Sequence, residues 1–417
     1  MTNKKSMKII LFEDNQVKNL YPITLTRPSF GILCGGITLF DLVKKEFPDS
    51  QIGLIVRDYL IQSVEQKYKP TNQTDNKILF LNARIVPSFE VIKKLSKKLI
   101  GKSQVIKHQK QIIGAYLDLK ELGLAAAKID QLKQADVEKF LAGLKLKNIE
   151  IDLPIFDQPW QVVTYNEEIL NANLNELKND YYEKQPGVFV GKNVKLPKEI
   201  VLNSSHGLIV IGSNTEVLPF CHLVGPLYLG NNCLVREFTV LKYSCCFGDV
   251  CKVAGEIEAS VMQGFTNKNH YGFLGYSYLG EWVNLGAGTV TSNLKNNYSS
   301  IRMSGVDTSC QFLGSIFGDY SRTAVNSTIY TGKVIGVNCH LYGTITTDVP
   351  SFTNYAKDFN CVVEFSLDKS IDLQKIVFAR RGKSQTKTDI DLLKKVFELT
   401  TTDRKLNKIK KGKILFR

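Results

Sequence analysis

The sequence has few of the residues that build disulfide frameworks or metal sites. It contains five histidines, and its nine cysteines include no CxxC pair. The number of cysteines is odd, and Cys245 and Cys246 are adjacent, which is a poor geometry for a disulfide. This pattern disfavours a disulfide-stapled fold and predicts a reduced, cytoplasmic protein.

Long apolar runs are also missing. No stretch approaches the ~20 apolar residues of a membrane-spanning helix. The segment from Met1 to Met7 leads directly into a short apolar run and lacks the features of a signal peptide. We therefore expect no membrane insertion.

Lysine and arginine outnumber aspartate and glutamate, and the formal net charge is +14. Much of the excess lies near the two ends, for example at Lys4-Lys5 and from Arg404 to Lys413. Such runs are typical of solvated terminal segments, and they also attract anionic substrates such as nucleotide phosphates or CoA. No recognition motif for nucleic acid accompanies the charge, so we expect no nucleic-acid partner.

The first part of the chain has the pattern of an α/β domain. Apolar runs suited to buried strands alternate with helical patterns, which predicts a parallel sheet with crossover helices. The strand candidates are 8–12, 52–56 and 77–81, and the helix candidates are 39–45 and 91–99, followed by a mostly helical stretch over 119–147. We expect this domain to span residues 1–180, before the break at Gln185-Pro186-Gly187.

An internal repeat begins after this break. Apolar residues recur at every sixth position, first at Val190, Leu196, Leu202 and Leu208, and after a shift of three at Ile211, Val217, Leu223, Leu229, Val235, Leu241, Phe247 and Val253. Ala259 and Phe265 continue the series less well. The spacing of six returns at Leu279 and Leu285, and again at Ile329, Ile335 and Leu341. Six residues per repeat match neither a helix face nor a flat strand.

This spacing predicts a left-handed parallel β-helix. Each side of a triangular coil is a short strand, one aliphatic side chain points inward, and roughly three repeats form one coil. A β-sandwich with chance spacing is the alternative, which the in-register run from Ile211 to Val253 disfavours. We expect the β-helix over residues 187–365 and a helical, basic tail over 366–417.

The segment from Gly255 to Tyr298 carries the chemistry. His270 stands among amide side chains and suits a general base near neutral pH, although a lone histidine is often structural. The glycines of the run from Leu285 to Thr289 would leave backbone N–H groups open to a ligand carbonyl. Asn284 and Asn293 offer donors and acceptors, while Lys268 and Lys295 offer charge to phosphates.

This segment resembles the acetyltransferase domain of the bifunctional N-acetylglucosamine-1-phosphate uridyltransferase/glucosamine-1-phosphate acetyltransferase family. The matching residues are Asn269-His270-Tyr271-Gly272-Phe273-Leu274-Gly275, then Val283-Asn284-Leu285-Gly286-Ala287-Gly288-Thr289, then Thr291-Ser292-Asn293. The match is closer still to a divergent Bacteroidetes-type subfamily, almost throughout residues 267–298. It extends to Gly332–Gly336 and Arg380-Arg381.

The resemblance implies roles for single residues. His270 would be the general base, Asn284 would contact the sugar, and the Ala287 backbone amide and Asn293 would hold acetyl-CoA. The family's tyrosine is Phe273 here, so one hydrogen bond to the substrate phosphate is absent. The family's basic residues do not align cleanly, and we expect Arg236, Lys268 and Lys295 in their place.

The first domain resembles the sugar nucleotidyltransferases in part. Leu20 to Pro28 preserves the L-x-P-L-T-x-x-x-P portion of their phosphate loop, but Phe12-Glu13-Asp14-Asn15 replaces its Gly-rich start and Ser29 replaces its lysine. Arg27 is then the expected phosphate contact. Asn82-Ala83-Arg84 stands where a metal-binding aspartate is expected, and Asn166 matches a second Mg²⁺ position.

The resemblance implies transfer of acetyl from acetyl-CoA to glucosamine 1-phosphate or a related amino sugar phosphate. Joining of the product to UTP or another nucleoside triphosphate would follow, with Mg²⁺. It also implies a homotrimer, which the aromatic cluster Tyr271, Phe273, Tyr276, Tyr278 and Trp282 favours unless these rings stack within the chain. One alternative is an acyltransferase or regulatory protein with a degenerate first domain. A γ-type carbonic anhydrase is disfavoured because the histidines show no close paired spacing.

Overall fold

The computed structural model describes residues 7–71 and 75–414, which form two compact units. The first unit contains the described residues up to Leu20, Thr26–Ile32 and Ile37–Asp157. The second contains Tyr21–Leu25, Leu33–Gly36 and the described residues from Gln158 onward. Each unit has its own hydrophobic core.

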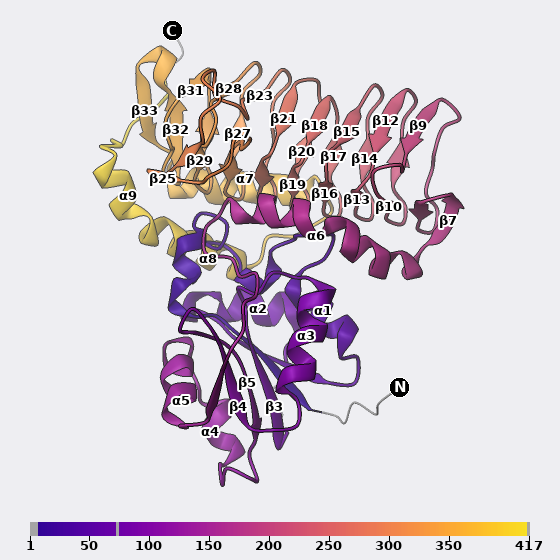
Figure 1. The fold of residues 1–417 in the computed structure, drawn as a ribbon. Coiled ribbons are helices and arrows are strands. Elements are labelled where there is room, and N and C mark those ends of the chain that lie inside the picture. Colours follow the sequence, from indigo (N-terminus) through magenta and orange to yellow (C-terminus); the bar gives the residue numbers. More distant parts are fainter. Residues whose placement is uncertain (1–6, 72–74, 415–417) are drawn as a thin grey trace. The chain divides into compact units, whose positions relative to one another are not determined.

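The first unit is a sheet with helices packed against it (Figure 1). The sheet has six strands, in the order β2-β1-β3-β5-β4-β6. Its strands are β1 Lys8–Phe12, β2 Gln51–Ile55, β3 Lys77–Asn82, β4 Gln104–His108, β5 Gln111–Asp118 and β6 Lys147–Glu150. Its helices are α1 Leu39–Glu46, α2 Ile61–Tyr68, α3 Phe89–Leu99, α4 Ala126–Asp130 and α5 Val137–Gly143. The predicted α/β class is confirmed.

The sheet is mixed, whereas the sequence pattern predicted a parallel one. Strand β1 pairs in parallel with β2 and β3, but β5 runs antiparallel to β3 and β4. The cause is a tight β4–β5 hairpin, whose turn residues Gln109 and Lys110 adopt positive φ. Neither residue is a glycine, so the hairpin had no clear sequence signal.

The second unit is a left-handed parallel β-helix, as predicted, with short strands in three faces. The first face contains β7 Tyr182–Gln185, β8 Val188–Val190, β10 Ile209–Ile211, β13 Leu227–Leu229, β16 Cys245–Phe247, β19 Val261–Met262, β22 Tyr278–Leu279, β26 Ile316–Phe317 and β29 Val334–Ile335. The second contains β11 Glu216–Val217, β14 Leu234–Val235, β17 Lys252–Val253, β20 Asn267–Lys268, β27 Arg322–Thr323, β30 His340–Leu341, β32 Thr353–Ala356 and β33 Cys361–Glu364. The third contains β9 Ile200–Asn203, β12 Cys221–Val224, β15 Val240–Lys242, β18 Glu256–Glu258, β21 Phe273–Gly275, β23 Val290–Thr291, β28 Thr328–Ile329 and β31 Thr344–Ile345. A small hairpin, β24 Arg302–Met303 with β25 Val306–Asp307, projects from one coil.

The hexad residues stack inside the coils. Ile211, Leu229 and Phe247 are in register on the first face, and all three are fully buried. The prediction of an inward position is wrong for Ala259 and Phe265, because both lie at corners of the coil with positive φ. The inward positions there are Ile257, Met262 and Lys268, since that coil is shorter than 18 residues.

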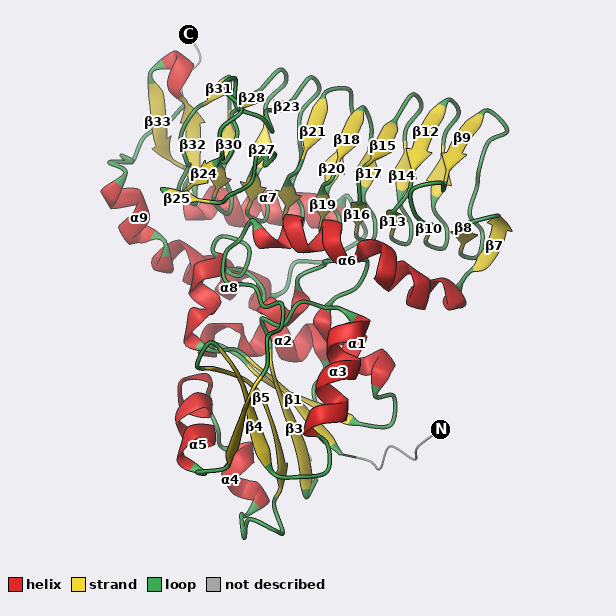
Figure 2. Cartoon of the chain, viewed as in Figure 1, coloured by secondary structure: helices red, strands yellow, loops and turns green. Residues whose placement is uncertain are grey.

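Helices border the β-helix of the second unit. They are α6 Gln161–Leu177, α7 Leu367–Ala379, α8 Lys387–Leu399 and α9 Thr401–Leu406. Figure 2 shows α6 and α7 in red along the stack of yellow strands. Helix α6 contacts β13 and β19, and α7 packs on α8. No helix in the described part of the chain is long and apolar enough to cross a membrane.

Candidate active site

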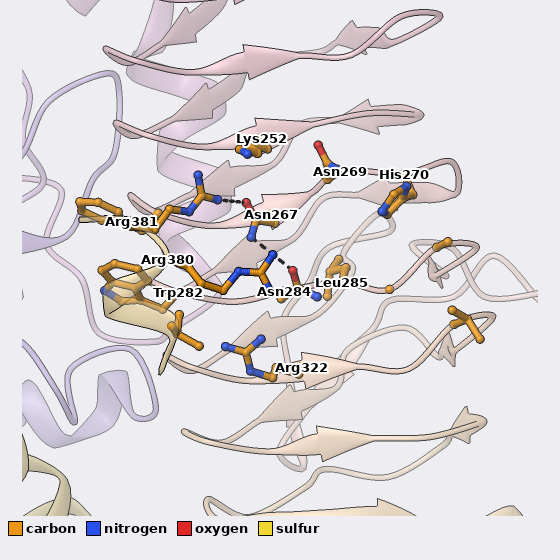
Figure 3. Close-up of a pocket in the computed structure, with 15 residues that line it drawn as sticks. Lys252, Asn267, Asn269, His270, Trp282, Asn284, Leu285, Arg322, Arg380 and Arg381 are labelled. Atoms are coloured by element: carbon orange, nitrogen blue, oxygen red, sulfur yellow. Dashed lines mark hydrogen bonds between the residues drawn. The ribbon is translucent and has the colours of Figure 1, made fainter. Parts of the chain in front are cut away.

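A cavity of about 460 Å³ lies on the second face of the β-helix, beneath the end of α7. It is lined by Lys252, Phe265, Asn267, Asn269, His270, Trp282, Asn284, Leu285, Gly286, Ala287, Arg322, Val325, Val377, Arg380 and Arg381. It therefore brings together three of the predicted site residues, namely His270, Asn284 and Ala287. Figure 3 shows His270 at one end of the cavity and Arg381 toward the other.

The wall of this cavity is one column of outward-facing residues. Lys252, Asn267, Asn284 and Arg322 are in register on successive coils, through a β17–β20 pair and two isolated bridges. Side chains alternate along a strand, so the neighbours of these residues point inward: Val253, Lys268, Leu285 and Thr323. The inward residues set the fold, and the outward ones face the cavity.

The end of α7 closes the cavity through aromatic packing and one polar contact. The Trp282 ring stacks on the Phe265 ring, with 4.3 Å between the ring centroids, and it contacts the Phe378 ring of α7, with 4.6 Å between the centroids. The Arg381 guanidinium donates to Asn267 Oδ1 at 2.6 Å, and Asn267 Nδ2 donates to Asn284 Oδ1 at 3.2 Å (Figure 3). Trp282 from the predicted aromatic cluster thus packs within the chain.

The cavity is strongly cationic. Lys252, Arg322, Arg380 and Arg381 line it, and none of its described lining residues is Asp or Glu. Burial, and then the charges of Arg381, Arg236 and Arg380, lower the pKa of Lys252. Burial and the charge of Arg380 lower the pKa of Arg322. Such a cluster is suited to an anionic ligand.

His270 lies at the corner between β20 and β21 and its side chain is exposed. Its carbonyl accepts a hydrogen bond from Lys268 Nζ, which also donates to Ala254 O at 3.3 Å. Lys268 occupies an inward position and is 0% exposed. The expected contact of Lys268 with a substrate phosphate is therefore incompatible with its position, and this side chain supports the corner that carries His270.

The sequence predicted that backbone N–H groups of the Gly286–Gly288 run are open to a ligand, and the structure agrees with this only in part. Gly286 N donates to Thr323 Oγ1 at 2.8 Å, and Gly288 N donates to Tyr271 O at 3.0 Å. Among the described residues, the Ala287 N–H has no hydrogen-bond partner. This leaves one backbone donor beside the cavity for a ligand oxygen.

The other predicted ligand contacts of this unit lie outside the cavity lining. Arg236 pairs with Glu237 at 3.3 Å and adds to the positive charge around Lys252. Lys295 donates to Ser300 O, and the Asn293 carbonyl accepts from Leu313 N at 2.9 Å. Both belong to the segment that follows β23, and neither lines the cavity.

Asn166, the predicted Mg²⁺ ligand, is fully buried in α6. Its Oδ1 accepts from Gly35 N at 2.9 Å and its Nδ2 donates to Ser244 O at 2.7 Å. Both ends of the amide hold backbone segments of the second unit. We therefore assign Asn166 a structural role.

In the first unit, two acidic residues follow β1 where glycines were expected, and both are paired with arginines. Glu13 accepts from Arg57 Nε at 2.9 Å and from Ser29 N at 3.0 Å. The predicted phosphate contact Arg27 is buried, and its carbonyl accepts from Arg57 Nη2 at 3.0 Å. The loop is thus closed around internal ion pairs.

The residues expected to hold Mg²⁺ do not fit that ion. Strands β1 and β3 are neighbours at the topological switch point of the sheet, where ligands of such folds bind. There Arg84, which is 0% exposed, donates to both oxygens of Asp14 and to Asp157 Oδ1 at 2.6 Å. Asn82 Nδ2 also points at Asp14 Oδ2, at 2.8 Å. Within residues 7–71 and 75–414, no three acidic, histidine or cysteine side chains form a metal site.

Comparison with known proteins relates the chain to transferases. The family model described as sugar nucleotidyl transferase matches residues 9–181. "Bifunctional protein GlmU" of Prochlorococcus marinus is 27% identical over 169 residues, which are 40% of this chain and 31% of that protein. The GlmU of Methanocaldococcus jannaschii is 25% identical over 304 residues, 71% of this chain and 64% of the relative.

A third relative is the "bifunctional sugar-1-phosphate nucleotidylyltransferase/acetyltransferase" of Sulfurisphaera tokodaii, 25% identical over 48% of this chain and 49% of that protein. The chain thus spans from about a third to 64% of the length of these curated relatives. Among solved structures, the N-acyltransferase AntD from Bacillus cereus is 14% identical with a TM-score of 0.22, over 49% of this chain and 99% of that one.

Lys268 is expected to make folding stability depend on pH. Burial lowers its pKa from 10.5 to about 8, so the unfolded chain binds this proton more tightly than the folded chain. The charged form therefore costs about 3 kcal/mol of stability below pH 8, and the cost disappears as the pH rises to about 10.5. Denaturant unfolding of wild type and Lys268→Met should show a rise in wild-type stability over this interval that the variant lacks. Parallel curves would contradict the buried, charged state.

Proposed function

We propose that this protein transfers an acetyl group from acetyl-CoA to the amino group of an amino sugar phosphate such as glucosamine 1-phosphate. The cavity of the second unit carries the proposal, because it joins a candidate base, His270, to four cations that suit a phosphorylated substrate. The name of the Sulfurisphaera relative, which combines a sugar-1-phosphate nucleotidylyltransferase with an acetyltransferase, supports acetyl transfer. The motif over residues 267–298 supports a place in the Bacteroidetes-type subfamily.

The chemistry follows from the residues at one end of the cavity. The substrate nitrogen attacks the thioester carbon of acetyl-CoA, and His270 takes the proton that the nitrogen loses. The Ala287 N–H donates to the oxyanion that develops on the former carbonyl oxygen. The C–S bond then breaks, CoA leaves as the thiolate, and the thiolate takes the proton from His270. Asn284 is the proposed contact of the sugar.

The first unit is the second part of the proposal. The family match over residues 9–181 favours nucleotidyl transfer from UTP or another nucleoside triphosphate to the acetylated product. The Arg84–Asp14 pair favours the alternative, an acyltransferase whose nucleotidyltransferase domain is degenerate. We propose acetyl transfer for this protein. The Mg²⁺-dependent nucleotidyl transfer stays a prediction from the sequence. A cytoplasmic location agrees with its nine free thiols.

The direct test is thiol release from acetyl-CoA by the full-length protein. Acceptors should include glucosamine 1-phosphate, glucosamine 6-phosphate, galactosamine 1-phosphate and unphosphorylated glucosamine. We expect release with at least one amino sugar phosphate and much slower release with glucosamine. Equal rates with and without acceptor, for every acceptor, would contradict the proposal. Pyrophosphate release from each nucleoside triphosphate, measured in the same samples, tests the first unit separately.

We also propose a homotrimer in which the corner that carries His270 meets a neighbouring copy. Phe220, Phe238 and Tyr271 lie at this corner on three coils, with the coil of β17 and β18 between the last two, and they are 59%, 69% and 66% exposed. The first two rings stack at 5.3 Å, so they form a continuous apolar edge. Exposed apolar edges of this kind are typical of interfaces, and closed cyclic symmetry is usual for homo-oligomers.

Light scattering should give a mass near three chains of 46.9 kDa for the wild type. The variant Phe220→Ser/Phe238→Ser should shift the mass toward one chain and lower acetyl transfer. A matched control is Tyr182→Ser, which changes another exposed ring, 64% exposed and distant in sequence. A wild-type mass of one chain with full activity would defeat both the trimer and a site shared between copies.

A further inference from the structure

The four cations of the cavity come from two parts of the fold. Lys252 and Arg322 belong to the outward column of the β-helix, while Arg380 and Arg381 follow α7. We call α7 together with these two arginines, residues 367–381, the C-terminal strap. Asn267 and Arg381, which meet across the cavity, are 114 positions apart in the chain.

The strap is held in place independently of its charges. Phe378 is 7% exposed. Its ring centroid lies 4.6 Å from that of Trp282 and 6.4 Å from that of Tyr320. This apolar contact fixes the end of α7 over the β-helix. The backbone that carries Arg380 and Arg381 is therefore in place before any ligand binds, and the Arg381 side chain is already held by Asn267 Oδ1, which reduces the entropy lost on binding.

Helix geometry explains part of this charge but not all of it. Cations are stabilised at the C-terminus of a helix by its dipole, and this suits Arg380 and Arg381. The dipole gives no reason for Lys252 and Arg322 on the facing wall. Arg322 Nε is buried without a hydrogen-bond partner among the described residues, as is the Oδ1 atom of Asn269. An unpaired buried donor on a guanidinium beside three other cations is costly unless an anion binds there.

We infer that a phosphate group of the substrates binds between Lys252 and Arg322 on one side and Arg380-Arg381 of the strap on the other. This inference rests on the proposed function for the identity of its ligand. The phosphate monoester of an amino sugar phosphate and the phosphates of CoA share the required chemistry. In either case the strap is part of the binding site, and the guanidinium groups act as paired donors to phosphate oxygens.

The test is equilibrium binding to the full-length protein by calorimetry, with no turnover required. The probes are inorganic phosphate, glucosamine 1-phosphate, CoA and glucosamine. The strap variant is Arg380→Gln/Arg381→Gln, and the variant of the facing wall is Arg322→Gln. The matched control is Lys375→Gln, an exposed cation on the same helix that does not line the cavity.

We expect the strap and wall variants each to weaken phosphate binding on the order of tenfold or more, the effect of losing charge-assisted hydrogen bonds. The control should bind like the wild type, and glucosamine should bind weakly to all. A loss confined to CoA, or confined to glucosamine 1-phosphate, supports the inference and identifies which ligand supplies the phosphate.

Two results would overturn the inference: phosphate probes that bind both variants as tightly as the wild type, or a wild type that binds phosphate esters no better than glucosamine. Because the variant of the facing wall leaves the strap intact, a strap variant that fails to fold does not remove the test. Phosphate binding without thiol release would contradict only the proposed acetyl transfer.

Discussion

Replacing His270 with alanine is expected to lower acetyl transfer by ~10²–10⁴-fold, the range for loss of a general base. The folded state should persist, because the His270 side chain is exposed and only its backbone carbonyl is held, by Lys268. Steady-state thiol release measures the effect, and the melting temperature checks the fold. Added imidazole should restore part of the rate by acting as a small external base.

The matched control is His206→Ala, because His206 is also exposed but does not line the cavity. Its rate should equal that of the wild type. If His270→Ala retains full turnover while folded, His270 has no role in proton transfer. The cationic cavity would then still be a binding site, but the base would have to be another group.

The second large effect concerns the first unit. Arg84→Met should lower the free energy of unfolding by about 3–5 kcal/mol, because it leaves the buried Asp14 carboxylate without its partner. The double variant Arg84→Met/Asp14→Asn should recover much of the loss, since it removes the uncompensated charge as well. Denaturant unfolding, monitored on the full chain, measures both changes.

Lys120→Met serves as the control, since Lys120 is an exposed cation of the same unit. Its stability should stay near that of the wild type. An Arg84→Met variant as stable as the wild type would mean that the guanidinium does not neutralise this site.

Much of the architecture was predictable because burial in a β-helix is periodic. The spacing of six from Ile211 to Val253 identified inward side chains correctly, each one buried in the core. The series failed where a coil shortened, because a change of coil length moves the inward position without changing residue type. Lys268 shows this most clearly, as a cation at an inward position next to Val253 and Leu285.

The candidate site was predictable only in part. His270, Asn284 and Ala287 lie in one local motif, so sequence alone brought them together. The facing cations Lys252 and Arg322 carry no periodic signal, since outward positions of a coil accept most residues. Arg380 and Arg381 reach the site through packing of Phe378 on Trp282, a long-range contact that no local pattern encodes.

The first unit shows a different limit. Resemblance to nucleotidyltransferases suggested Arg27 and Asn166 as ligand contacts, although the loop after β1 had lost its glycines. The structure pairs Glu13 with Arg57 and Asp14 with Arg84, and it buries Arg27 and Asn166. Charge complementarity within a buried loop depends on which side chains meet in space, and spacing along the chain does not reveal that.

The mass of the acceptor after reaction tests the central claim most directly. Full-length protein is incubated with acetyl-CoA and glucosamine 1-phosphate, and the sugar phosphate is analysed by mass spectrometry beside samples with His270→Ala and His206→Ala. The account predicts that the sugar phosphate gains one acetyl group on nitrogen with wild type and His206→Ala, and far more slowly with His270→Ala. An unmodified acceptor with the wild type, while phosphate probes still bind the cavity, would contradict acetyl transfer to this substrate.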